Sequence, residues 1–173
     1  MSQSPLYDFA IPIFANGLKA LKNILTQAEN HARANNLDPD AVYTQARLVD
    51  DQLPLIFQIQ NAAKTIQVNV DRMMGGESDP SANTEKTFDD LHARIWAVSY
   101  MVEAVIPETV KSREDVVVDV LAGGKPIKLS VKQAVQLHGI PNFLFHITTA
   151  YSILRANGVP LGKADFICSF VGL

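Results

Sequence analysis

Hydrophobic residues recur at alternating steps of three and four in four separate stretches of this chain. Such spacing places one apolar stripe along each of four α-helices. The average step of about 3.5 residues suits helices that pack against one another at shallow angles. The sequence therefore predicts a mostly α protein, built as an antiparallel four-helix bundle. The stripes comprise Phe14, Leu18, Leu21, Leu25, Ala28 and Ala32; Ile56, Ile59, Ala63, Ile66, Val70 and Met73; Phe88, Leu91, Ile95, Val98, Val102 and Val105; and Phe143, Ile147, Ala150 and Leu154.

Prolines and a capping residue indicate where the first helices begin. Pro5 and Pro12 suit a short opening turn, after which a long helix is expected to run to about Asn36. Asp38 followed by Pro39 is typical of an N-cap with proline at the first helical position. A short helix should therefore precede the second long one.

Glycines and a threonine indicate the next boundaries. Gly75 and Gly76 are predicted to end the second long helix, and the polar residues 77–83 are predicted to form a loop. Thr84 is the predicted N-cap of the third helix. Gly158 is predicted to end the fourth.

Between the third and fourth stripes the pattern becomes one that is typical of β-strands. Residues 116–121 and 126–130 flank a Gly-Gly pair, which predicts a short β-hairpin before the last long helix. A short helix over 131–138 should follow the hairpin. A break at 139–141 is then expected, with Pro141 starting the last long helix.

Composition limits the class of protein. A chain of 173 residues with 47% apolar and 19% charged residues is long enough for one globular domain, which we expect to span residues 1–173. The net charge of −3 and the scattered lysines argue against a nucleic-acid partner. A single cysteine, Cys168, fits a reducing compartment. No signal peptide or long apolar run is visible, so we expect a cytoplasmic protein without a membrane partner.

His146 is the most informative candidate for chemistry, because it lies within the apolar run 143–147. A buried imidazole needs a hydrogen-bond partner. One interpretation is a core histidine that is bonded to a carbonyl or to a side chain such as Asn142, which lies four residues away on the same helix face. The other interpretation is a ligand-binding group or a general base.

The last third of the chain also resembles a known family. The resemblance rests on Asn142-Phe143, Phe145-His146, Thr149-Ala150-Tyr151, Leu154-Arg155, Gly158-Val159-Pro160 and the segment Gly162–Phe166. Leu18, Leu21 and Leu25, Phe57-Gln58, and Leu91 with Arg94 extend it over essentially the whole chain. These residues are similar to an uncharacterised bacterial and fungal family, described only as a domain of unknown function. That family resembles the DinB/YfiT-like four-helix bundles, many of which carry a divalent metal.

The resemblance implies where a metal site would lie. The wider superfamily uses three histidines, one on the second helix and two, four residues apart, on the last. His146 matches the last ligand, Asn142 the ligand four residues earlier, and Gln58 the position on the second helix. One imidazole with two amides is a weak donor set for zinc or nickel. We therefore expect no metal cofactor, with His146 as a weak candidate ligand.

Three functions compete at this point. The first is small-molecule binding without a metal, in a polar-lined pocket of the bundle formed by Gln58, Asn142, His146, Tyr151 and Arg155. The second is a thiol-dependent transferase, a metal-dependent enzyme of the DinB/YfiT type, so whether the protein is an enzyme stays open. The third is a structural homodimer without a ligand. A homodimer is expected in any case, because an isolated hairpin needs cover and two-fold dimers are the commonest solution.

Overall fold

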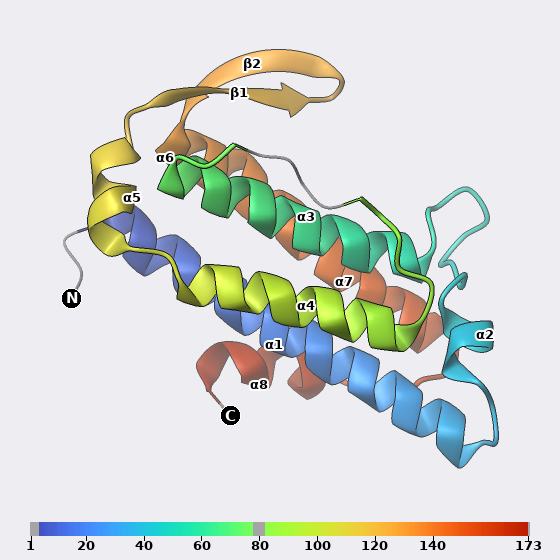
Figure 1. The fold of residues 1–173 in the computed structure, drawn as a ribbon. Helices are drawn as coiled ribbons and strands as arrows, with labels where there is room; N and C mark the ends of the chain where they lie inside the picture. Colours follow the sequence, from blue (N-terminus) through green and yellow to red (C-terminus); the bar gives the residue numbers. More distant parts are fainter. Residues whose placement is uncertain (1–3, 78–81, 173) are drawn as a thin grey trace.

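A computed structural model describes residues 4–77 and 82–172 of the chain. The elements are α1 (Pro5–Ala34), α2 (Pro39–Tyr43), α3 (Leu55–Met74), α4 (Phe88–Glu103), α5 (Pro107–Arg113), β1 (Val117–Ala122), β2 (Lys125–Ser130), α6 (Val131–Gln133), the π-helical segment η1 (Ala134–Gly139), α7 (Ile140–Ala156) and α8 (Lys163–Val171). Four long helices, α1, α3, α4 and α7, form the antiparallel bundle, as Figure 1 shows. In this bundle α1 and α3 each pack against both α4 and α7.

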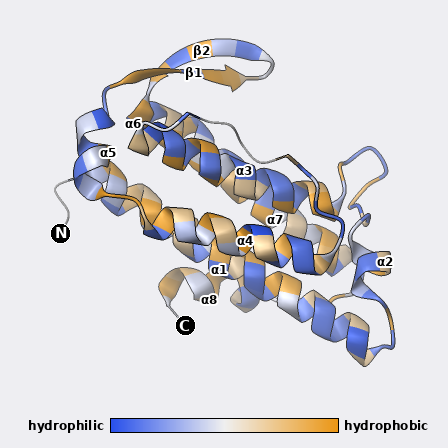
Figure 2. Ribbon diagram, in the orientation of Figure 1, coloured by the Kyte–Doolittle hydropathy of each residue, from blue (hydrophilic) through white to orange (hydrophobic). Residues whose placement is uncertain are grey.

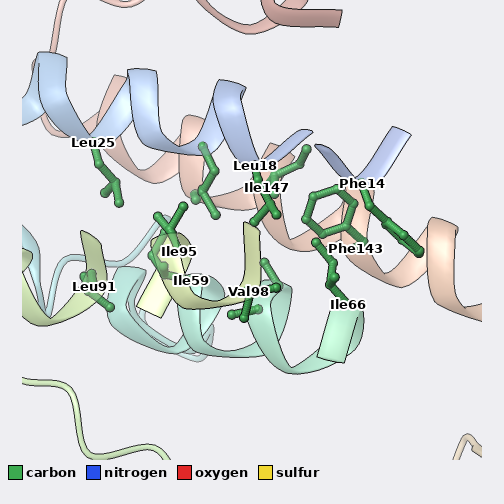
Figure 3. Packing of buried hydrophobic residues seen from close by; sticks show 14 of the residues in the cluster. Phe14, Leu18, Leu25, Ile59, Ile66, Leu91, Ile95, Val98, Phe143 and Ile147 are labelled. Carbon is green, nitrogen blue, oxygen red and sulfur yellow. The ribbon is translucent and has the colours of Figure 1, made fainter. Parts of the chain in front are cut away.

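The predicted apolar stripes form the core. All of their residues are buried in one continuous cluster. Figure 3 shows side chains from all four helices meeting there, with the Phe14 and Phe143 rings edge to face at a centroid distance of 5.6 Å. Helix α1 approaches α7 so closely that a Cβ on Gly17 would collide with the buried Phe143 ring. In Figure 2, hydrophilic residues are frequent along α1 and α3, whereas α4 shows many pale and orange residues, and its Trp96 and Tyr100 are exposed.

Two predicted helix starts were wrong. Helix α1 begins at Pro5 without an opening turn, because the Ser4 side chain caps it, and Pro12 lies inside the helix. Pro12 removes one backbone hydrogen bond, but buried residues on both sides of it keep the helix continuous. Helix α4 is capped by Thr87 and not by Thr84, because Thr87 forms a capping box with Asp90.

Other predicted boundaries are confirmed. Asp38 caps α2, and Gly75 ends α3 in the left-handed region with φ 83°. Gly158, with φ 90°, follows the end of α7. Residues 78–81 of the predicted 77–83 loop lie outside the described residues.

The hairpin is also confirmed. Strands β1 and β2 pair antiparallel, and Gly123 and Gly124 form the turn with φ of 57° and 78°. Val120 is buried, while the outward Val117 and Leu121 are exposed. The hairpin crosses one end of the bundle near α3 and α6 (Figure 1).

The predicted break before the last helix was wrong. Ser130 caps a single helical run that continues from Val131 to Ala156 through η1. Pro141 has no N–H, and its ring would clash with the carbonyl of Leu137 in an ordinary α-turn. The wider π turn, in which the amide of Ile140 donates to Val135, accommodates the ring.

The C-terminal segment folds back onto the bundle as α8, which packs against α1. Asn23 donates to the Asp165 carbonyl at 2.8 Å, and Gln27 donates to its carboxylate at 2.5 Å. The amide of Gly162 donates to the same carboxylate, and this hydrogen bond lowers the pKa of Asp165. Among the described residues, no helix has both the length and the apolar character needed to cross a membrane.

Candidate functional site

Polar side chains lie along the contact between α3 and the helical run of η1 and α7. We call them the polar seam: Gln58, Thr65 and Asn69 of α3, His138 of η1, and Asn142 and His146 of α7. The α3 members are seven and four residues apart and therefore share one helix face. Gln58, Thr65, Asn69 and His146 are all buried.

At one end of the polar seam, Gln58 and His146 form a bonded pair. The Gln58 amide nitrogen donates to the Leu53 carbonyl at 2.8 Å, so the amide oxygen faces the imidazole. The distance from that oxygen to His146 Nδ1 is 2.8 Å. Because an amide oxygen only accepts, Nδ1 carries the proton and Nε2 keeps its lone pair when the ring is neutral.

Aromatic rings enclose this pair. The ring centroids of Phe57 and Phe145 lie 6.2 and 5.4 Å from that of His146, both edge to face. Burial among them lowers the pKa of His146, because the charged imidazolium is poorly solvated there. The imidazole is therefore neutral at neutral pH.

Asn142 has a different partner from the one considered above. Its amide nitrogen donates to Thr65 Oγ1 at 2.7 Å, whereas His146 pairs with Gln58. The two α7 side chains therefore each bond across to α3 and not to each other.

A hollow of about 240 Å³ lies at the other end of the polar seam, between α3, η1, α7 and β1. Its lining consists of Asn61, Lys64, Thr65, Val68, Asn69, Arg72, Leu121, His138 and Asn142. Two buried atoms in this lining, Asn69 Oδ1 and His138 Nδ1, have no hydrogen-bond partner among the described residues.

The position of Asn69 depends on its neighbours. Its amide nitrogen donates to the Thr65 carbonyl at 2.6 Å, which leaves Oδ1 without a donor. The side chain also lies against Gly139, where an added Cβ would stand 2.5 Å from Oδ1. Glycine at position 139 therefore allows the close approach of η1 to α3.

Tyr151 and Arg155 lie away from the polar seam and from the hollow at its end. They lie five and nine residues after His146, which corresponds to about 140° and 180° around an α-helix. The Tyr151 ring packs edge to face on Phe166 of α8 at 6.1 Å, and Arg155 is exposed. Of the predicted pocket residues, Gln58 and His146 form one pair and Asn142 lines the hollow.

The donor set does not fit the metal that the superfamily carries. The amide oxygen of Gln58 is already bonded to His146, and the Asn142 side chain turns toward Thr65. Within residues 4–77 and 82–172, no group of three histidine, cysteine or acidic side chains is gathered at metal-binding distance. One imidazole among amides is a poor zinc or nickel site.

The bundle, its hairpin before α7 and its returning C-terminal helix define a DinB-like helical protein. A crystal structure of a DinB family member protein from Shewanella denitrificans matches it with a TM-score of 0.80 and 34% sequence identity, over 94% of this chain and 91% of that chain. Residues 6–167 match the family model described as "Domain of unknown function (DUF1993)", and the chain belongs to that family. No curated protein sequence matches this chain.

Sequence reasoning missed three members of the polar seam: Thr65, Asn69 and His138. Thr65 and Asn69 each lie next to a stripe residue of α3, where a polar side chain at a buried position is unusual. These two polar residues beside the apolar stripe were the signal from which the polar seam could have been predicted. His138 was interpreted as the end of a short helix, because the π turn that buries its Nδ1 was not foreseen.

Proposed function

We propose that this protein binds a small molecule, without a metal, in the hollow lined by Asn142. The observation that carries the proposal is the pair of buried atoms, Asn69 Oδ1 and His138 Nδ1, that lack partners in this lining. A buried polar atom without a partner costs about 1–3 kcal/mol. A bound molecule would supply the missing partners, and such local costs are typically retained at functional sites.

The hollow limits the size of the ligand. A volume of about 240 Å³ is below the usual range for drug-sized ligands. It suits a ligand of a few non-hydrogen atoms, or the polar end of a larger one. The exposed Leu121 of β1 offers an apolar surface at the edge for the remainder.

The pair of Gln58 and His146 supports the site indirectly. It joins α3 to α7 and so holds in place the two helices that form the hollow. The transferase alternative gains no support from the donor set, because it needs a metal centre that these residues do not fit. The homodimer stays a prediction.

The test is NMR of the isotope-labelled protein with a panel of small polar molecules, both uncharged and charged. We expect a binder to shift the resonances of His138 and Asn142, and Asn142→Leu to abolish these shifts by filling the hollow. Arg155→Leu is the matched control, because it makes the same kind of change on an exposed face of α7. Binding that survives Asn142→Leu, or no binder at all, would overturn the proposal.

A further inference from the structure

The hollow at the end of the polar seam has an unbalanced charge. Lys64 and Arg72 both line it, and its lining contains no carboxylate. Neither cation forms an ion pair within the described part of the chain. Both positive charges are therefore available to a ligand.

Arg72 is held at the hollow by contacts that leave its charge uncompensated. One guanidinium nitrogen donates to the backbone carbonyl of Asp119 in β1 at 3.3 Å. The carboxylate of Asp119 is turned to Lys128, at 3.1 Å. Arg113 donates to the backbone carbonyl of Arg72 at 3.1 Å, and this contact adds no negative charge beside the Arg72 side chain.

The buried lining adds hydrogen-bonding groups. Asn69 is 1% exposed, and its Oδ1 can accept a hydrogen bond from a hydroxyl group. The π turn of η1 carries His138 at the same hollow, and its Nδ1 is buried without a partner in the described residues. π-helical turns are frequent at functional sites, where they place such side chains.

We infer that this hollow binds a small oxyanion, the carboxylate or phosphate group of a metabolite, through Lys64 and Arg72. The inference rests on the proposed function and names the class of ligand for the same site. Arginine suits both groups, because its planar nitrogens match the spacing of their oxygens. A protonated phosphate oxygen or a neighbouring hydroxyl of the ligand would donate to Asn69 Oδ1.

The experiment titrates the protein with inorganic phosphate and, separately, with acetate, at constant ionic strength set by sodium chloride. Amide resonances and calorimetry follow the binding. We expect saturable shifts at Thr65, Arg72 and His138 with at least one anion. The anion that binds with the higher affinity shows whether the hollow is a phosphate site or a carboxylate site.

Charge-removing variants locate the binding. Lys64→Gln and Arg72→Gln should each weaken it about tenfold, the effect of losing one charge-assisted hydrogen bond. Lys64 is exposed, so its variant keeps the fold even if the Arg72 variant loosens the hairpin. Lys22→Gln is the matched control, because Lys22 lines a separate hollow between α1 and α4, and its variant should bind like wild type.

Two results would overturn the inference: no saturable binding of either anion, or an equal loss in the Lys22→Gln control. Suppose instead that the wild type binds neither anion but binds an uncharged molecule that Asn142→Leu no longer binds. In that case this inference fails while the proposed function stands. If nothing binds, both fail.

Discussion

The two ends of the polar seam differ in how their buried groups are satisfied. At the Gln58 end, the amide nitrogen bonds to Leu53 and the amide oxygen to His146. At the Asn69 end, Oδ1 has no partner, and neither does Nδ1 of His138 in the part of the chain described. Both ends join the same two helical runs and have similar polar residues.

The difference shows that polar residues in a helix contact serve two purposes. A fully bonded pair fixes how two helices pack, and its removal leaves a stranded partner. A group that is not fully hydrogen-bonded within the protein can still bond to a ligand or to an ordered water. The first end is therefore expected to be structural and the second functional.

The largest expected effect is at the bonded end. His146→Ala should lower the free energy of unfolding by about 2–4 kcal/mol, because it opens a cavity and strands the Gln58 oxygen. Urea unfolding measures the change. Arg155→Ala, at an exposed position of the same helix, should stay within about 0.5 kcal/mol of wild type. If the two variants were equally mild, the bonded end would not be structural.

A smaller effect is expected in how the free energy of unfolding depends on pH, through the titration of His146. The unfolded imidazole has a pKa of 6.5, and burial lowers the pKa of His146 in the native state. Below about pH 6.5 the unfolded chain binds a proton at this residue more readily than the native one. Stability that is present above this pH is therefore lost as the pH falls.

Urea unfolding at about pH 7 and about pH 5 tests this, with His146→Gln as the comparison. Glutamine does not titrate, so the variant should lose less stability between the two pH values than wild type. An identical loss in both proteins would show that other groups cause the pH dependence. Every other titratable group is present in both proteins, so its contribution cancels in this comparison.

The smallest change in the free energy of unfolding is expected at the Asn69 end of the polar seam, where a substitution should stabilise the protein slightly or leave its stability unchanged. Asn69→Leu removes the unpartnered oxygen and replaces it with an apolar group of similar size. The substitution also removes the bond from Asn69 Nδ2 to the Thr65 carbonyl, but that carbonyl keeps its helical bond within α3. The free energy of unfolding should therefore stay unchanged or rise by about 1 kcal/mol. A loss as large as that of His146→Ala would mean that the two ends do not differ.

Much of the fold could be predicted from the sequence. The stripes, the hairpin and the caps at Asp38 and Gly75 depend on local spacing and on residue type, and both can be read along the chain. The errors arose where a side chain overrode a local rule. Thr87 was preferred over Thr84 because Asp90 completes a capping box. The predicted break before Pro141 became a π turn.

The site was less predictable. The positions of Gln58 and His146 followed from the family resemblance. Their hydrogen bond could not be predicted, because it depends on how α3 and α7 pack against each other. The displacement of Tyr151 and Arg155 could have been foreseen from their angle around the helix. The unpartnered atoms of Asn69 and His138 could not, because satisfaction of a polar group depends on every neighbour that folding brings to it.

The π segment η1 also makes the helix sensitive to length. A π turn contains one residue more than an α turn, so η1 holds an insertion that the helix has absorbed without breaking. Deleting one residue there would force the ordinary α-helical register, in which the Pro141 ring meets the carbonyl four residues earlier, and would rotate everything before it by about 100°. His138 would leave the hollow, the hairpin would turn away from the bundle, and α7 would keep its core face.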